Sequence, residues 1–320
     1  MHTLLTLLAI IIFIALLWGI GLLSYTLRWK IRIEKIVPPR GQFTQISTGK
    51  LHYVERGTGP AVLLIHGLGG QLGNFDCGLI DNLARDHRVI AIDRPGMGYS
   101  ERPDTAPTGH PENAQLMFEV IEALKIDRPL VVGHSLGGAI SLAMALQAPE
   151  KLRGLALIAP LTLPSETAPA AAFNNLKISS NWLRWLIAWT LATPGGFRNA
   201  AVVLDQIYGP ETMPANAPTQ GGGLLGLRPR HFFNTSRDFM ASGRGLKQMA
   251  ERYDSLALPV RVLYGTEDRT LDHTRQGQEL AALHPAIGLT LVPGGHMLPV
   301  TQPDTCAEFI RKAVQDMPDA

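Results

Sequence analysis

The 320-residue chain has only two cysteines, too few for a disulfide framework to hold the fold together. It has almost no excess of one charge, with 29 basic and 27 acidic side chains. Five of the bases but only one acid, Glu34, fall in the first 40 positions, which leaves 24 bases and 26 acids for the other 280 residues. A nucleic-acid-binding domain needs basic residues gathered on its own surface, so the charges argue against nucleic acid as a partner.

Charged side chains are absent from His2 to Leu27, and residues 4–23 are almost all apolar. A helix rises 1.5 Å per residue, so about 20 such residues span the roughly 30 Å hydrocarbon core of a bilayer. We therefore predict that residues 1–40 form a transmembrane helix followed by a basic juxtamembrane segment. A cleaved signal peptide is the alternative. However, no basic residues precede the apolar run, the run is longer than the apolar region of a usual signal peptide, and no A-x-A cleavage site follows it.

The flanks of this run indicate how the chain meets the membrane. We expect aromatic side chains at the interface and basic ones among the headgroups just beyond, namely Trp18, Tyr25 and Trp29, then Arg28, Lys30 and Arg32. The protein is expected to be a single-pass, N-terminally anchored membrane protein, in the inner or plasma membrane if its source is bacterial. Basic residues after the helix favour a cytoplasmic domain by the positive-inside rule, although one short tail leaves the side open.

Two further expectations depend on partners and on the redox compartment. In an oxidising compartment Cys77 and Cys306 are candidates for a disulfide, and otherwise they are two unpaired buried thiols. A homodimer is a candidate assembly, but Gly19 and Gly21 do not form the G-x-x-x-G motif of packed transmembrane helices.

Beyond Pro39, short apolar runs alternate with longer amphipathic ones. The expected strands are residues 41–48, 51–57, 61–66, 88–93, 129–134, 152–159, 260–265 and 287–292, and the expected helices are residues 74–84, 112–124, 136–147, 272–283 and 303–314. Strands and helices in this order predict an α/β fold, with a mostly parallel sheet covered by helices on both faces.

The alternation stops near Leu163 and resumes at Pro259. We predict that residues 164–258 form a helical lid between the sixth and seventh strands, and that residues 41–163 and 259–320 form the core. Trp182, Trp185 and Trp189 recur there at helical spacing and so share one face. That face either packs the lid against the core, or it lines an acyl chain or dips into the membrane. We take the three tryptophans as candidate substrate-binding residues.

A G-x-S-x-G pentapeptide, Gly133 to Gly137, stands between an expected strand and an expected helix. A serine at such a sharp turn needs small residues two positions before and after it, because the backbone folds back on itself there. The turn exposes the hydroxyl of Ser135 and places the amide of Leu136 at a helix N-terminus, where it can stabilise an oxyanion. Ser135 is therefore the candidate nucleophile.

A serine nucleophile needs a base, and the base needs an acid to orient it. Asp268 and His296 follow the last two expected strands, at the same edge of the sheet as Ser135. Asp272 and Glu267 are rivals for the acid. Among the other histidines, the side chain of His134 is expected to point away from the serine, and His273 and His284 are expected on a solvated helix.

The loop His66-Gly67-Leu68-Gly69-Gly70 follows the third expected strand. Its glycines let the backbone approach a substrate closely, so the amides of Leu68 and Leu136 are the candidate oxyanion hole. A phosphate-binding loop is the alternative, but the loop matches neither G-x-x-x-x-G-K-[ST] nor G-x-G-x-x-G.

Together these motifs resemble those of the α/β-hydrolase fold family over residues 42–314. The stretch Asp93 to Ser100 is also similar to the D-x-P-G-x-G-x-S segment common in these hydrolases. The resemblance implies a lipase- or esterase-like serine hydrolase that needs no cofactor or metal. Relatives that cleave epoxides or haloalkanes place Asp at the nucleophile position, where this chain has Ser135, so the resemblance disfavours those two activities. The acid loop departs from many relatives, since it reads GTEDRTLD with no proline soon after the aspartate.

The anchor and the tryptophan-rich lid favour lipid-like esters, as for a lipase, phospholipase A or lysophospholipase acting at a lipid bilayer. Within the family, a small-ester esterase, a C–C bond hydrolase or a prolyl aminopeptidase is the alternative. A non-catalytic membrane-tethered binding module is the alternative outside enzymes, and the intact set of candidate residues argues against it.

Overall fold

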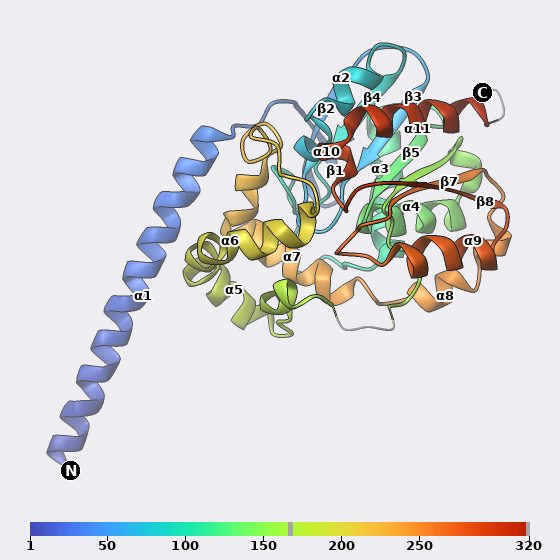
Figure 1. Ribbon diagram of the computed structural model, residues 1–320. Coiled ribbons are helices and arrows are strands. Elements are labelled where there is room, and N and C mark those ends of the chain that lie inside the picture. The colour runs from blue at the N-terminus through green and yellow to red at the C-terminus, as the bar shows by residue number, and fades with distance from the viewer. Residues whose placement is uncertain (166–168, 318–320) are drawn as a thin grey trace.

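The computed structural model describes residues 1–165 and 169–317 (Figure 1). Residues 166–168 of the predicted lid and residues 318–320 of the predicted core lie outside the described residues. Figure 1 shows a long N-terminal helix that leaves the body at one side, and a group of lid helices between that helix and a central sheet.

The central sheet has eight strands in the order β1-β2-β4-β3-β5-β6-β7-β8. Their bounds are β1 Gln42–Ile46, β2 Gly49–Arg56, β3 Ala61–Ile65, β4 Arg88–Ile92, β5 Leu130–His134, β6 Gly154–Ile158, β7 Val260–Gly265 and β8 Ile287–Val292. β2 is antiparallel to both β1 and β4, and all the other pairs are parallel. The predicted α/β fold with a mostly parallel sheet is confirmed.

Both faces of the sheet are buried, which explains why its inner strands read as continuous apolar runs. In β3, Leu63 and Ile65 face one core, and Val62 and Leu64 face the other. The first core is closed by α3 (His110–Ala123), α4 (Leu136–Gln147), α8 (Leu246–Ala250) and α9 (Leu280–Leu283), and the second by α2 (Leu79–Leu83) and α11 (Pro303–Gln315). The short α10 (Leu298–Thr301) precedes α11.

The prediction of one helix over residues 74–84 is wrong. The chain forms a 3₁₀ turn, Leu72–Phe75, and then α2, which begins only after Gly78. Gly78 has a φ of 119°, a backbone conformation that glycine adopts without strain and that interrupts a helix.

The prediction of a regular helix over residues 272–283 is also wrong. A π-helical turn, Thr274–Glu279, precedes the short α9. The widened turn holds the buried Gln276, whose side-chain oxygen accepts hydrogen bonds from the amides of Thr162 (2.7 Å) and Leu163 (3.0 Å). His284, expected in solvent, is buried after α9 with its Nδ1 2.6 Å from Asp254 Oδ1.

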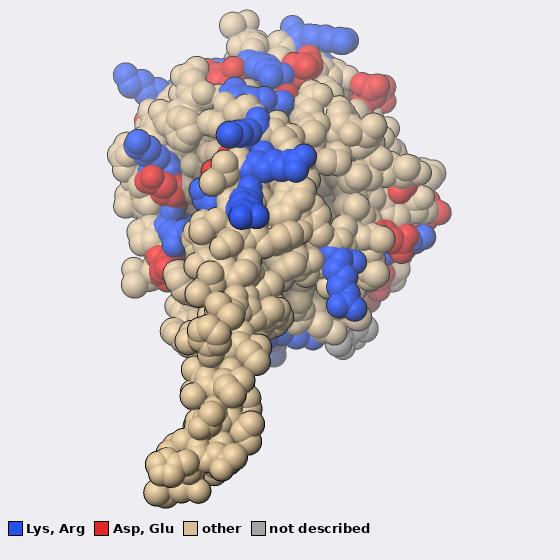
Figure 2. Space-filling view, turned by 90° about the vertical axis from the view of Figure 1, so that its left-hand side faces the viewer, with Lys and Arg blue, Asp and Glu red and all other residues tan. Residues whose placement is uncertain are grey.

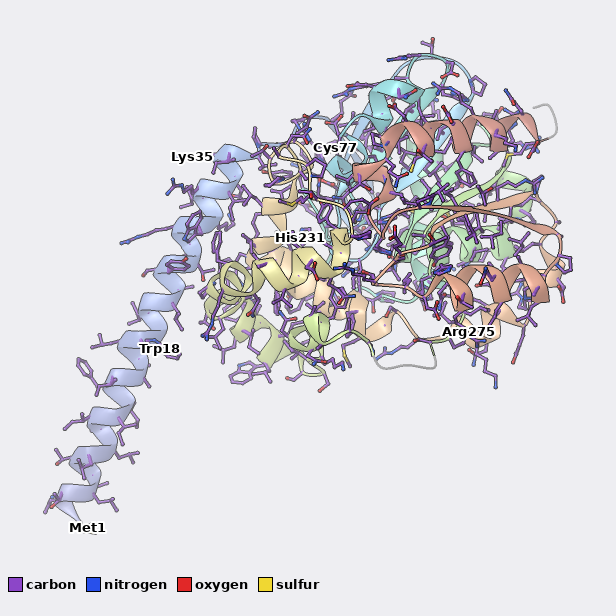
Figure 3. The ribbon with its side chains drawn as sticks, in the orientation of Figure 1. Met1, Trp18, Lys35, Cys77, His231 and Arg275 are labelled. Atoms are coloured by element: carbon purple, nitrogen blue, oxygen red, sulfur yellow. The ribbon has the colours of Figure 1, made fainter. Side chains whose placement is uncertain are left out.

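The segment predicted as a lid, residues 164–258, contains α5 (Asn181–Thr190), α6 (Ala192–Tyr208) and α7 (Pro229–Ala241), which lie between α1 (His2–Ile36) and the sheet (Figure 1). α1 is long and apolar enough to cross a membrane, and residues 2–18 are all exposed. Figure 3 shows Trp18 on the stretch of α1 that stands clear of the body, and Lys35 near the point where the chain reaches it.

The last third of α1, residues 24–36, packs against the lid, and we call it the stem. Thr26 and Ile33 are completely buried, and the Trp29 ring lies 4.4 Å, centroid to centroid, from the ring of Phe197 in α6. Trp29, which we expect at the membrane interface, is half-buried by this contact. In the sequence, only the charged side chains distinguish the stem from the exposed part of α1. Which side of the stem is buried depends on its packing against α5 and α6.

The tryptophan-bearing side of α5 does not pack against the core. Trp182 is 72% exposed and Trp185 50%, whereas the buried side chains of the helix are Arg184 and Ala188. Of nine large hydrophobic side chains exposed after residue 36 in the described residues, six belong to α5, α6 or the residue joining them, namely Trp182, Leu183, Trp185, Leu186, Leu191 and Val202. We call the exposed side of α5, formed by the first four, the tryptophan face.

Charged side chains mark one end of α1. Figure 2 shows Lys and Arg gathered over its upper part, near the body, and only uncharged side chains over its lower part. The two cysteines are free thiols: Cys306 is completely buried in α11, and Cys77 is partly buried, with a pKa raised by burial to about 11.

Candidate active site

Ser135 occupies a strained turn between β5 and α4. Its φ of 54° and ψ of −120° are rare for a residue with a side chain and are typical of the sharp strand-to-helix turn predicted for it. A Cβ on Gly137 would overlap the carbonyl oxygen of Ile65, and one on Gly133 would crowd the hydroxyl of Ser141 and the backbone of Gly137. The two glycines are therefore needed because neighbouring chain fills the space around the turn.

The structure brings Ser135, His296 and Asp268 together. His296 Nε2 lies 3.0 Å from Ser135 Oγ, and His296 Nδ1 lies 2.7 Å from Asp268 Oδ2. The second oxygen of Asp268 accepts hydrogen bonds from the amides of Thr270 (2.7 Å) and Leu271 (2.9 Å), which fix the carboxylate. The side chains of His296 and Asp268 are almost fully buried.

The rival acids and histidines lie elsewhere. Glu267 is exposed, and Asp272 is exposed and accepts a hydrogen bond from the amide of Thr274 at 2.9 Å. His134 points away from the serine hydroxyl, as predicted, and its Nε2 lies 3.0 Å from the backbone carbonyl of His296. Burial lowers the pKa of His134 to about 3, so its ring is neutral at pH 7 and donates this hydrogen bond, which supports the His296 backbone.

The glycine-rich loop lies against the serine, as expected. A Cβ on Gly67 would fall 2.8 Å from Ser135 Cβ, so only glycine fits there. Within the described residues, the amides of Leu68 and Leu136 donate no hydrogen bond. Leu136 is buried and Leu68 is half-buried, and both amides are available to an acceptor that a substrate would bring.

Two residues that the sequence did not single out hold this loop. The guanidinium of Arg94, which is completely buried, donates to the carbonyls of His66 (3.0 Å) and Gly67 (3.1 Å). His231 of α7 lies within 2.9 Å of the carbonyl of Gly69 through its Nε2. Arg94 lies inside the recognised segment that begins at Asp93, but no sequence pattern marked His231.

A third such residue links the lid to the loop of His296. The carboxylate of Glu211, which follows α6, accepts a hydrogen bond from the amide of Gly295 at 2.7 Å. Its other oxygen accepts from the side chains of Gln302 (2.9 Å) and Thr301 (3.2 Å). Glu211 lies in an irregular segment without motif or periodicity, so the sequence carried no signal for it.

The model of the alpha/beta hydrolase fold family matches residues 60–303. The chain therefore belongs to the alpha/beta hydrolase fold family, as its motifs and its sheet indicated.

Individual relatives differ in activity. Haloalkane dehalogenase 2 of Mycobacterium tuberculosis is 34% identical over 146 residues, which are 45% of this chain and 50% of the dehalogenase. The chain thus matches about half the length of the first such relatives. An uncharacterized protein of the same species is 27% identical over 283 residues, which are 87% of this chain and 81% of that protein.

A solved structure of similar shape aligns with nearly the whole chain, including α1. The crystal structure of a membrane phospholipase A, described as a novel bacterial virulence factor, aligns with a TM-score of 0.67 and 23% identity over 98% of this chain and 97% of that one. At this identity the likeness shows the fold alone. Because the alignment covers 98% of this chain, it includes most of α1.

Proposed function

We propose that the protein is a membrane-anchored serine hydrolase that cleaves carboxylic esters of lipid-like substrates, in the manner of a lipase, phospholipase A or lysophospholipase. The observation that carries the proposal is the chain of two hydrogen bonds from Ser135 through His296 to Asp268. A serine hydroxyl in this arrangement can lose its proton to the imidazole as it attacks a carbonyl.

The proposed reaction proceeds through an acyl-enzyme. Ser135 Oγ attacks the ester carbonyl, and His296 Nε2 takes the hydroxyl proton while Asp268 stabilises the imidazolium and keeps Nδ1 protonated. The amides of Leu68 and Leu136 stabilise the negative charge that develops on the carbonyl oxygen. His296 then returns the proton to the departing alcohol, and a water molecule, activated by the same imidazole, releases the fatty acid.

Three observations support a lipid-like substrate. α1 carries an apolar stretch of spanning length, and the tryptophan face lies on a helix that packs beside it. Thr26 of α1, three residues past the apolar run, donates a hydrogen bond to the carbonyl of Thr190 at the end of α5 (3.4 Å). This contact brings α5 to the level where α1 would leave the bilayer, so the exposed rings of Trp182 and Trp185 are proposed to contact lipid.

The similarity to haloalkane dehalogenases does not favour dehalogenation. That reaction needs a carboxylate at the turn between strand and helix to displace a halide, and this chain has the hydroxyl of Ser135 there. A hydroxyl activated by an imidazole suits acyl transfer instead.

Two measurements on the purified whole chain in detergent test the proposal. A fluorophosphonate probe should label the wild type and not Ser135→Ala, whereas Ser141→Ala, which removes a buried hydroxyl bonded to Gly137, should still be labelled. Absence of labelling in folded wild-type protein would contradict a serine hydrolase. Fatty-acid release from phospholipids and glycerides should accompany labelling, and activity confined to short soluble esters would contradict the lipid substrate.

A further inference from the structure

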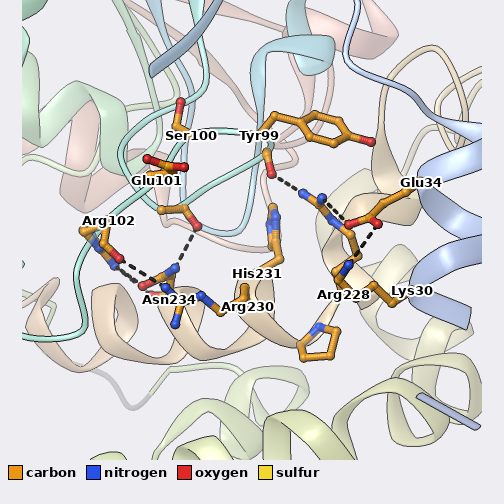
Figure 4. A pocket seen from close by; sticks show the side chains of 13 residues that line it. Lys30, Glu34, Tyr99, Ser100, Glu101, Arg102, Arg228, Arg230, His231 and Asn234 are labelled. Atoms are coloured by element: carbon orange, nitrogen blue, oxygen red, sulfur yellow. Dashed lines mark hydrogen bonds and ion pairs between the residues drawn. The ribbon is translucent and has the colours of Figure 1, made fainter. Parts of the chain in front are cut away.

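A cavity of about 190 Å³ lies between the stem of α1, the loop after β4 and the start of α7 (Figure 4). Its charged and polar lining includes Lys30, Glu34, Arg102, Arg228, Arg230 and His231. The cavity is separate from the Ser135 site, since neither Ser135 nor His296 lines it. It is smaller than the pockets of about 300 Å³ or more that enclose whole ligands, and its volume fits a small headgroup.

The cations around this cavity outnumber the carboxylates paired with them. The carboxylate of Glu34 is shared by Lys30 Nζ (3.0 Å) and Arg228 Nη1 (3.2 Å). In the same way Asp238 is shared by Arg94 and Arg102, at 3.1 and 2.8 Å.

Two further charges complete the lining. Arg230 pairs with Asp104 at 2.8 Å, and the carboxylate of Glu101 accepts a hydrogen bond from the amide of Lys50 at 3.0 Å. Among the residues that line the cavity, the cations are Lys30, Arg102, Arg228 and Arg230 and the carboxylates are Glu34 and Glu101, so the balance favours an anion over a cation as its occupant.

Three lining side chains keep a buried nitrogen without a hydrogen-bond partner among the described residues. These atoms are Nε of Arg102, Nε of Arg228 and Nδ1 of His231, and each residue is more than nine-tenths buried. The guanidinium carbon of Arg228 lies over the ring of Tyr99, 4.6 Å from the ring centroid. Buried polar atoms without partners are rare in folded proteins, so these three nitrogens are candidates for hydrogen bonds to a ligand.

These nitrogens differ in chemistry. An arginine Nε can only donate. His231 donates through Nε2 to the carbonyl of Gly69, and burial lowers its pKa to about 4, so its Nδ1 is an acceptor at neutral pH. The first turn of α7 begins at Pro229 in the cavity wall, and a helix N-terminus adds a partial positive charge and free amides.

We propose that this cavity binds a phosphate group, either free or in the headgroup of an anionic lipid. The excess of cations and the two unpaired donors suit the charged oxygens of phosphate, and the Nδ1 acceptor suits a hydroxyl carried on or beside it. Lys30 lies seven residues past Leu23, about 10 Å along the helix axis from the end of the apolar run, which is close to the headgroup layer. The proposal does not rest on the hydrolase activity.

The test measures thermal unfolding of the whole chain in detergent, with inorganic phosphate against chloride at equal ionic strength. Phosphate should raise the unfolding midpoint of the wild type by about 2–4 °C at concentrations of about 10 to 100 times Kd. The shift should be lost in Arg228→Gln and reduced in Lys30→Gln, and it should persist in Arg244→Gln, which removes an exposed cation of the same lid. The shift of each variant is the difference between its own unfolding midpoints in phosphate and in chloride. A variant that is less stable in chloride can therefore still show the shift.

The source of the phosphate is distinguished in nanodiscs. If the ligand is a lipid headgroup, phosphatidylglycerol nanodiscs should abolish the shift caused by free phosphate, whereas phosphatidylcholine nanodiscs should preserve it. If free phosphate is the ligand, the shift should be the same in both lipids. Absence of a shift in folded wild-type protein, or an equal shift in Arg228→Gln and Arg244→Gln, would overturn the proposal.

Discussion

Glu211 links the lid to the loop of His296, and its removal should slow catalysis. In Glu211→Ala the amide of Gly295 loses an acceptor at 2.7 Å, and the side chains of Gln302 and Thr301 lose theirs. A hydrogen bond to a charged group contributes about 1.5–3 kcal/mol, and each 1.4 kcal/mol corresponds to a tenfold change in rate. If the Gly295 bond holds His296 in its working position, kcat should fall about 10- to 100-fold.

The conservative variant distinguishes positioning from general damage. Glu211→Gln keeps one oxygen that can accept from Gly295, so it should remain within about fivefold of the wild type. KM should change less than threefold in both variants, because Glu211 bonds to the loop behind His296 and not to the serine. Glu251→Gln, an exposed lid carboxylate, is the matched control and should behave as wild type.

The assay is steady-state hydrolysis of a soluble 4-nitrophenyl ester, with thermal unfolding measured on the same samples. A folded Glu211→Ala protein whose kcat stays within twofold of the wild type would refute the reasoning. So would equal losses in Glu211→Ala and Glu211→Gln, since the second keeps an acceptor for the Gly295 amide.

Three further predictions follow from the same structure. Asp268→Asn should lower kcat by about 10⁴-fold in the same assay, because an amide at this position favours the wrong tautomer of the imidazole, and a loss below tenfold would contradict its role. Replacing Trp182 and Trp185 together by serine should weaken vesicle binding and vesicle hydrolysis several-fold without slowing soluble esters, whereas equal losses on both would place the rings in the catalytic machinery. Burial lowers the folded-state pKa of four histidines, to about 3 for His134 and about 4 for His231 and in the same direction for His66 and His110, while the unfolded chain binds these protons near pH 6.5. Their contribution to stability should therefore be constant above pH 6.5 and fall from there toward pH 4 by at most about 5.4 kcal/mol per pH unit for the four, and His231→Gln should lower this slope by about 1.4 kcal/mol per pH unit in urea unfolding.

The sequence predicted the elements whose determinants are local. The buried strands are continuous apolar runs, and the turn at Ser135 is set by glycines at fixed offsets, so these were predicted within one or two residues. Asp268 and His296 could be placed near Ser135 because the C-terminal ends of parallel strands meet at one edge of a sheet.

The remaining features depend on contacts between distant segments. The spacing of Trp182 and Trp185 in the sequence would be the same for a buried and for an exposed tryptophan face. The face is exposed because α5 packs on the body through its opposite side, which carries Arg184. The break at Gly78 depends on a backbone conformation that spacing does not encode. The bond from Glu211 to Gly295 joins the lid to the core across a large separation in the chain.

The packing of α1 on the body indicates how its apolar segment should be removed. Removing residues 1–40 would uncover the surface against which Ile33 and Trp29 pack, whereas a chain beginning at Ser24 keeps the stem and loses only the apolar span. The shorter protein therefore tests the membrane span without disturbing the lid.

The most direct test of the central claim is fatty-acid release from phospholipid and glyceride vesicles by the whole chain, by the chain beginning at Ser24 and by Ser135→Ala. We predict release by the whole chain, at least tenfold less on vesicles by the shortened chain with soluble-ester turnover retained, and none by Ser135→Ala. No release by the folded whole chain while soluble esters are cleaved, or release by Ser135→Ala equal to that of the wild type, would contradict it.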